Sequence, residues 1–171
     1  MLRRLRSDDG FGLVELVVAM VILNVGVLAL LSAIVSSEAS LRRASRVATA
    51  STLADAQMEL YRALTYSAIA LDPTAVDATD SAYRADTALG GSISNDVTTT
   101  RGCSGLPNQC NPSRLVTGPD HGTYRIDTYV VARTPPSGRA GKLVTVVVRN
   151  GSSLGTTLVR QSSSFDASTG Q

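Results

Sequence analysis

The chain of 171 residues lacks tryptophan and contains two phenylalanines, five tyrosines, one histidine and two cysteines. A core built mainly from Ala, Val and Leu is small, so we expect no large enclosed ligand pocket. One histidine and two cysteines are too few for a zinc site with Cys and His ligands. The formal net charge is +2, which argues against nucleic acid bound across the whole surface. We therefore expect no metal or other cofactor and at most one globular domain.

The two cysteines, Cys103 and Cys110, lie close together in a segment rich in Gly, Pro and Asn. Such a pair forms either a disulfide or two free surface thiols. We predict the disulfide, which implies an oxidising compartment. On the entropic model the short closed loop would stabilise the fold by about 2.5 kcal/mol.

A short polar stretch, residues 1–10, precedes an almost wholly apolar segment, Phe11–Val35. As an α-helix this segment would be about 37 Å long, enough to cross the bilayer core with some tilt. It is too long for the apolar region of an ordinary signal peptide. The positive-inside rule does not decide its orientation, because three arginines precede it and three follow it, namely Arg3, Arg4, Arg6, Arg42, Arg43 and Arg46.

Glu15 is the one ionisable residue inside the apolar segment. A carboxylate within a membrane helix costs on the order of a few kcal/mol, and less near the end of the span. Two interpretations stay open on physical grounds. Glu15 is either a functional site whose charge is met by a partner, or an interface residue whose side chain reaches toward the headgroups.

The sequence Gly10-Phe11-Gly12-Leu13-Val14-Glu15-Leu16 resembles the processing site of prepilin-type proteins, Gly-Phe-Thr-Leu-x-Glu before an apolar helix. In that family a dedicated peptidase and methyltransferase cuts after the Gly and methylates the new terminal Phe. The resemblance implies that Gly10 ends a leader, that Phe11 becomes N-methylated and that Glu15 supports assembly. In a bundle of staggered subunits, the ammonium of one Phe11 would neutralise Glu15 of a neighbour.

The continuation, Val18–Leu30, is similar to minor pilins of the pilus-modification type and to I-type pseudopilins of type II secretion. Four positions depart from the family pattern. Gly12 stands where Thr is usual, and Asp8 and Asp9 precede the cut where Lys or Arg is more common. Ser32 stands where major pilins often carry Pro, which favours a minor subunit.

The next segment, Ser36–Thr65, contains neither Pro nor Gly and is rich in good helix formers. We predict one helix over residues 11–65, with residues 36–65 as its amphipathic continuation. Its buried stripe is predicted to comprise Leu41, Ala44, Ala48, Leu53, Ala56, Leu60 and Leu64.

Three arginines near the start of this continuation, Arg42, Arg43 and Arg46, suggest contacts with nucleic acid or lipid headgroups. The alternative is a solvated face or ion pairing between subunits, with Glu38 and Glu59 as acceptors. We prefer this alternative, because no aromatic or second basic cluster supports binding of nucleic acid.

Residues 66–121 lack clean periodicity, and we predict a long surface connection with one short strand near Val97–Arg101. A calcium loop is the alternative role for four acids in the first part of this region. Their spacing fits no EF-hand pattern, so we predict that they are solvated: Asp72, Asp77, Asp80 and Asp86.

Three β-strands are predicted after this connection, and the last two are joined by an Asn150-Gly151 turn: Thr123–Arg133, Lys142–Arg149 and Leu154–Ser163. The fold class is then α+β. A long N-terminal membrane-spanning helix packs the C-terminal half of its length on a small antiparallel sheet. The head, residues 66–171, is what pilin heads look like.

Asp120 and His121 could suggest a catalytic base with its orienting carboxylate. Adjacent residues rarely point at one another, so we predict a turn before a strand and no enzyme.

The leading hypothesis is a minor pilin or pseudopilin. Such a protein is anchored in the inner membrane with its head outside the cytoplasm, and then enters a filament with other subunits. A subunit of a type II secretion or competence system is the alternative within this class. A secreted or membrane-anchored binding protein, with an ordinary signal peptide cut before Ser40, is the alternative outside it.

Overall fold

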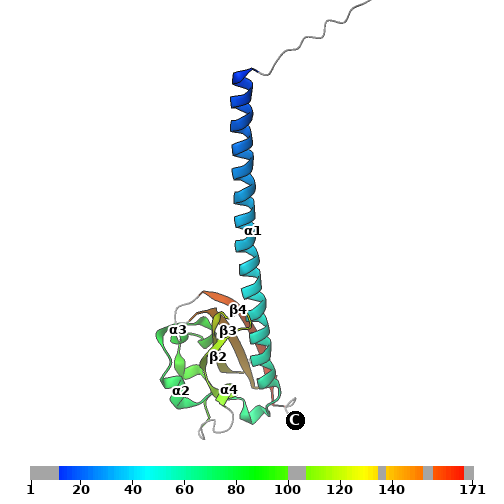
Figure 1. Ribbon diagram of the computed structural model, residues 1–171. Coiled ribbons are helices and arrows are strands. Elements are labelled where there is room, and N and C mark those ends of the chain that lie inside the picture. The colour runs from blue at the N-terminus through cyan, green and yellow to red at the C-terminus, as the bar shows by residue number, and fades with distance from the viewer. Residues whose placement is uncertain (1–11, 100–106, 135–137, 152–155, 168–171) are drawn as a thin grey trace, which may run out of the picture. The chain divides into compact units, whose positions relative to one another are not determined.

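The computed structural model describes residues 12–99, 107–134, 138–151 and 156–167. The chain divides into two compact units, Met1–Arg43 and Ala44–Gln171. Helix α1, Leu13–Arg62, contributes residues to both units (Figure 1). We describe each unit by itself.

The described part of the first unit consists of the N-terminal portion of α1, residues 13–43. It contains no proline, and Gly26 is its one helix-weakening residue. Its most apolar window has a mean hydropathy of 2.7, and none of that window is buried. By length and composition it is the one candidate membrane span among the described residues, although a signal sequence would meet the same criteria. The predicted long apolar helix is confirmed.

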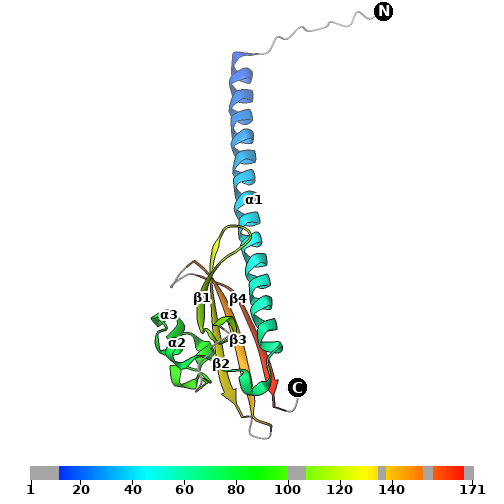
Figure 2. The same cartoon turned by 60° about the horizontal axis from the view of Figure 1, so that its bottom comes forward.

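The second unit contains a four-stranded antiparallel sheet in the order β1-β2-β3-β4 (Figure 2). Its strands are β1 Ser113–Thr117, β2 Thr123–Arg133, β3 Gly141–Asn150 and β4 Thr157–Asp166. Residues with positive φ form the turns that follow β1 and β3, His121 at 57° and Gly151 at 78°. Each strand therefore pairs with its neighbours in the chain, as expected for a meander.

One face of the sheet packs against the last turns of α1. The fully buried helix residues include Ala50, Ala54, Met58 and Tyr61. The small alanines let the helix approach the sheet closely, and the larger side chains fill the space between them. The strand residues of this core alternate along the chain, as a sheet face requires: Tyr124, Ile126, Val130, Val144, Val146 and Val148.

Short helices cover part of the opposite face of the sheet (Figures 1 and 2). Tyr83 and Leu89 pack there against Tyr129 and Val147, and the rings of Tyr83 and Tyr129 stack at 4.3 Å. Tyr83 belongs to α3 Ser81–Arg84 and Leu89 to η2 Thr87–Leu89. The other short helices of the described residues are η1 Tyr66–Ala68, α2 Pro73–Asp77, η3 Ile93–Asn95 and α4 Pro107–Cys110. We refer to residues 72–97 as the short-helix segment.

The fourth strand was predicted in the wrong place. It is β1, Ser113–Thr117, whereas the described residues near Val97 make only single bridges, Leu71 with Thr98 and Asp96 with Val131. The other strands agree with the prediction to within three residues at each end. The region 66–121 is also more than a connection, because the short-helix segment places Tyr83 and Leu89 in a core.

The predicted buried stripe of the helix was mostly wrong. Ala44, Ala48 and Ala56 are exposed, and Leu41 is 67% exposed. The buried stripe instead includes Gln57, a polar residue that the apolar pattern excluded. Gln57 can be buried because its amide donates to the carbonyl of Asn108 at 2.9 Å. The helix also ends at Arg62 rather than at Thr65.

Candidate functional site

Glu15 lies in the first turn of α1, where the helix dipole favours a negative charge. Its side chain is exposed and makes no hydrogen bond or ion pair with any residue that the structure describes. The other residues of the predicted processing site, Gly10 and Phe11, lie outside the described residues. Cleavage between them and methylation of Phe11 therefore stay predictions.

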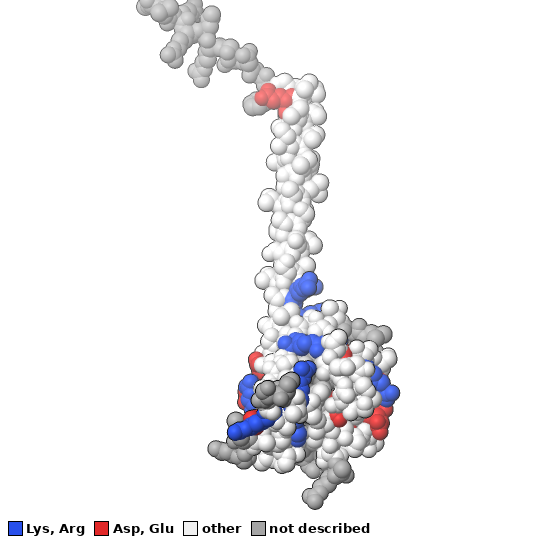
Figure 3. All heavy atoms as spheres, turned by 180° about the vertical axis from the view of Figure 1, so that it is seen from behind, with Lys and Arg blue, Asp and Glu red and all other residues white. Residues whose placement is uncertain are grey.

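The neutral polar side chains of the apolar stretch are satisfied within the helix. The Asn24 amide donates to the carbonyl of Met20 at 2.9 Å, and the Ser32 hydroxyl donates to that of Ala29 at 2.8 Å. An ionised carboxylate can only accept hydrogen bonds, so Glu15 cannot use the helix carbonyls. No charged side chain occurs between Glu15 and Glu38, and Figure 3 shows this surface in white. Glu15 is thus an isolated charge on an apolar surface.

The three arginines of the basic cluster, Arg42, Arg43 and Arg46, are exposed. Glu38, a predicted acceptor for a neighbouring subunit, lies 3.7 Å from Arg42 of the same helix, and both side chains are mostly exposed. Glu59 pairs with Arg62 in the same way. These surface pairs contribute little to stability. The cluster therefore agrees with the predicted solvated face.

Buried ion pairs join the strands to the short-helix segment. Asp127 is fully buried on β2, where one oxygen accepts from Arg125 at 2.7 Å and the other from Arg149 at 2.9 Å. Arg125 also pairs with Asp80, while Arg149 and Arg160 of β4 both pair with Asp86. Asp127 thus compensates two guanidinium groups and cannot be removed without leaving both partly unpaired.

Asp80 and Asp86 also cap short helices, so the prediction that these acids are solvated was wrong for both. Asp80 accepts from the backbone of Tyr83, and Asp86 accepts from that of Ala88. The hydrogen bond from Arg125 lowers the pKa of Asp80 to about 2. Burial alone would raise the pKa of Asp86, but the Ala88 amide and the two arginines lower it overall. Both acids are ionised structural groups.

Asp96 is a buried carboxyl that has no cationic partner among the residues the structure describes. Burial raises its pKa to about 6, although hydrogen bonds from Tyr83 and Val130 partly oppose this. The Tyr83 hydroxyl lies 2.8 Å from Asp96 Oδ2 and 2.7 Å from the carbonyl of Thr128. The Tyr83 hydroxyl has one proton, so it can donate a good hydrogen bond to only one of these two oxygens. A protonated Asp96 would donate to Tyr83, which could then donate to Thr128.

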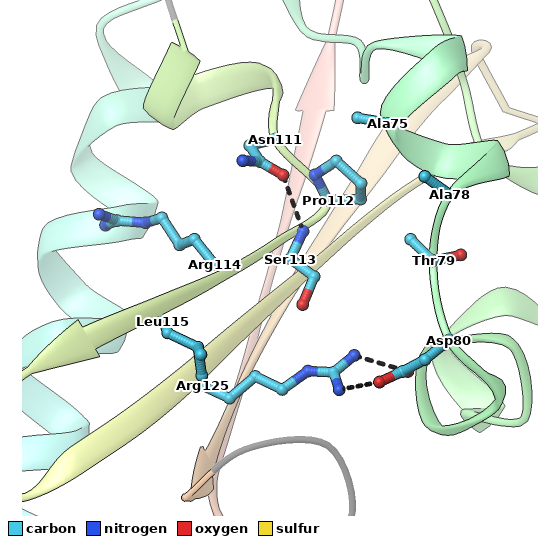
Figure 4. A pocket seen from close by; sticks show the side chains of 10 residues that line it. All are labelled: Ala75, Ala78, Thr79, Asp80, Asn111, Pro112, Ser113, Arg114, Leu115 and Arg125. Carbon is cyan, nitrogen blue, oxygen red and sulfur yellow. Dashed lines mark hydrogen bonds and ion pairs between the residues drawn. The ribbon is translucent and has the colours of Figure 1, made fainter.

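An open pocket of about 430 Å³ lies between α2 and the start of β1 (Figure 4). Three charged residues line it: Asp80 and Arg125 face each other in a two-pronged ion pair, and Arg114 is the third. Asn111 accepts from the backbone of Ser113 at 3.3 Å. Because Asp80 and Arg125 satisfy one another, this pair does not indicate a particular ligand.

The Asp120–His121 segment forms the predicted turn. The amide of His121 donates to the carbonyl of Gly118 at 3.0 Å, and His121 is exposed. The Asp120 carboxylate accepts from the Tyr124 hydroxyl at 2.5 Å, so it pairs with the side chain of Tyr124 rather than with that of His121. The pair therefore has the geometry of a turn.

Cys110 ends α4 and is 4% exposed, and its carbonyl accepts from the Asp72 amide at 3.0 Å. Its predicted partner, Cys103, lies outside the described residues. The disulfide between them stays a prediction.

The buried ion pairs of the sheet were not predicted from the sequence. The signal was present in β2, where Arg125 and Asp127 alternate on one side of a strand that is otherwise mostly apolar. A polar pair at period two within a buried strand indicates a satisfied network. The partners of this pair, Asp80 and Arg149, lie too far away in the sequence to be identified.

The family model described as the prokaryotic N-terminal methylation motif matches residues 5–31. No curated protein and no solved structure matches the chain significantly. The matched segment contains Gly10, Phe11 and Glu15 together with the start of the exposed apolar helix. The chain therefore carries a prepilin-type methylation motif at its N-terminus, and this motif indicates a type IV pilin-like or pseudopilin protein.

Proposed function

We propose that this protein is a minor pilin or pseudopilin that is cut after Gly10, methylated on Phe11 and assembled from the inner membrane into a filament. The observation that carries the proposal is the isolated charge of Glu15 on an exposed apolar helix. An ammonium at Phe11 of a neighbouring subunit would offset the cost of burying this carboxylate. Assembly would then satisfy a group that has no partner among the described residues.

The continuation of α1 supports this proposal over an ordinary secreted protein. A signal peptidase would have to cut before Ser40, yet residues 37–40 are helical and the Ser40 hydroxyl donates to the carbonyl of Ser36 at 3.0 Å. The same helix then continues into the second unit and contributes its core residues. Cleavage there would cut within a regular helix.

A minor role is supported by Ser32, which stands where major pilins often carry Pro. The same helix pattern fits pseudopilins of type II secretion and of competence systems. The neighbouring genes would distinguish these systems, because each is encoded with its own assembly components.

The decisive experiment measures the intact mass of the mature protein from the cells that make it. We expect a terminus at Phe11 carrying one methyl group, whereas Gly10→Leu should keep the leader. A terminus at Ser40, or normal processing of Gly10→Leu, would overturn the assignment. The same preparations, compared before and after reduction and alkylation, test the proposed Cys103–Cys110 disulfide.

Glu15→Ala tests the assembly role separately. This variant should be processed and inserted normally, because a carboxylate has been removed from the apolar helix. Its recovery in sheared filaments should fall strongly, since its neighbour's ammonium loses its partner. Wild-type recovery of Glu15→Ala would show that Glu15 is not an assembly residue.

A further inference from the structure

Four arginines in the sheet strands differ in how their charge is compensated. Arg125, Arg149 and Arg160 each pair with at least one carboxylate on the face that the short-helix segment covers. Arg114 of β1 has no carboxylate within 4.0 Å among the described residues. Arg133, a fifth arginine of these strands, is exposed. Arg114 is thus the one partly buried arginine of the strands that has no carboxylate partner among the described residues.

Arg114 extends from β1 toward α1, away from the Arg125–Asp80 pair (Figure 4). One of its Nη atoms donates to Gln57 Oε1 at 2.8 Å. Its Nε is buried and has no hydrogen-bond partner among the described residues. The position of Gln57 is fixed in turn, because its amide donates to the carbonyl of Asn108 at 2.9 Å.

This environment is costly for a cation. Burial lowers the pKa of the Arg114 guanidinium, since desolvation disfavours its charged form. Arginine nevertheless stays charged and offers its donors in a planar fork that matches a carboxylate. A half-buried guanidinium that has no carboxylate partner among the described residues is therefore better satisfied by a carboxylate that arrives from outside the chain and meets its accessible donors.

The surroundings of Arg114 indicate a protein partner. Leu115, the next residue, is 60% exposed and is the one large apolar side chain of the described second unit that is so exposed. Both residues lie on β1, which pairs with β2 alone among the described strands. Because they are consecutive, their side chains leave opposite faces of the sheet, but both line the same open pocket at this edge. An arginine and an exposed leucine at an unpaired strand edge are typical of a protein interface, whereas a free anion needs only the charge.

We propose that Arg114 binds a carboxylate of a neighbouring subunit in the filament, with Leu115 and the open edge of β1 completing the contact. This inference rests on the proposed function and adds a second polar group that assembly satisfies. Glu15 would be satisfied between the helices of adjacent subunits, and Arg114 between their heads.

The test compares stability with assembly for one variant. In the full-length protein in detergent, Arg114→Met should change the unfolding midpoint little, because the removal of a desolvated charge offsets the lost hydrogen bond to Gln57. In the cells that make the protein, its recovery in sheared filaments should fall by about tenfold. Arg114→Lys should fall less, because it keeps the charge but loses the fork. Arg133→Met removes an exposed arginine of β2 and should enter filaments normally.

Each outcome has a definite meaning. Arg114→Met at the wild-type level in filaments that exclude Glu15→Ala overturns this inference alone. A lowered unfolding midpoint that accounts for the lost recovery shows that Arg114 is a structural residue. If acetate or phosphate stabilises the wild type while Arg114→Met assembles normally, Arg114 binds small anions instead. Absence of the wild type from filaments overturns the proposed function together with this inference.

Discussion

In residues 13–43 the apolar side chains of α1 lie on the surface, and the charge of Glu15 has no partner among the described residues. In the second unit the apolar side chains lie between the end of α1 and the sheet, and buried acids pair with buried arginines. The first unit is therefore built to be completed by a membrane or by other helices. The second unit is largely completed by its own residues.

The largest loss of stability is expected on removing Asp127, the buried acid of the second unit. Asp127→Ala would leave Arg125 and Arg149 partly unpaired in a buried site. We expect a loss of about 3–5 kcal/mol in the free energy of unfolding, measured by denaturant titration of the full-length protein in detergent. Asp77→Ala, which removes an exposed acid, is the control and should change it little. Equal effects of both variants would contradict a structural role for the Asp127 pairs.

A second test compares apolar truncations in the two units. Met58 is fully buried, so Met58→Ala should cost about 2–5 kcal/mol in the free energy of unfolding. Leu28 is 66% exposed, and Leu28→Ala should cost less than about 0.5 kcal/mol in detergent. If Leu28 packs against neighbouring helices in the filament, Leu28→Ala should lower filament recovery more than Met58→Ala does. A destabilised Leu28→Ala protein would mean that residues 13–43 already pack within a single chain.

The sequence predicted the parts of the fold that depend on local patterns. Alternating β-branched residues and the Asn150-Gly151 turn placed β2 and β3 almost to the residue. The prediction of the buried stripe of α1 failed at Gln57. This polar residue is buried because it donates a hydrogen bond to Asn108, which is distant in the sequence. Strand β1 was missed because its five residues show no strong strand pattern.

The candidate sites also divide into those that a local sequence pattern predicts and those that depend on remote residues. Glu15 was identifiable because a charge in an apolar run is anomalous on local grounds. The ions of the sheet depend on pairs between remote residues, such as Arg125 and Asp80. That Arg114 has no carboxylate partner among the described residues becomes visible only once the acids of the second unit have been placed.

The pH dependence of stability should reveal two opposite slopes within the second unit. The pKa of Asp96 is raised from 3.8 to about 6, so the folded state binds its proton more tightly than the unfolded state. Its contribution is present below pH 3.8 and is lost as the pH rises through about 6. The pKa of Asp80 is lowered to about 2, so its contribution is present above pH 3.8 and is lost as the pH falls toward 2.

Asp96→Asn separates these slopes. Its amide can donate to Tyr83 while its oxygen accepts from Val130, which mimics the protonated acid. The loss of stability between pH 4 and 6, about 2–3 kcal/mol for a shift of this size, should disappear in the variant. The acid limb below pH 3.8 should remain, since Asp80 is unchanged. A wild-type profile in Asp96→Asn would show that another group titrates.

The smallest expected effect comes from the ion pair of α1 itself. Glu38 and Arg42 lie 3.7 Å apart with side chains that are 63% and 81% exposed. Water screens such a pair, so Glu38→Gln should change the free energy of unfolding by less than about 0.5 kcal/mol. Titration with salt should leave the difference between the two proteins near zero. A large effect would mean that Glu38 has a partner beyond the described chain, as proposed for Glu15. The contrast with Asp127 then isolates burial as the cause, because both residues are acids paired with arginine and differ chiefly in their access to water.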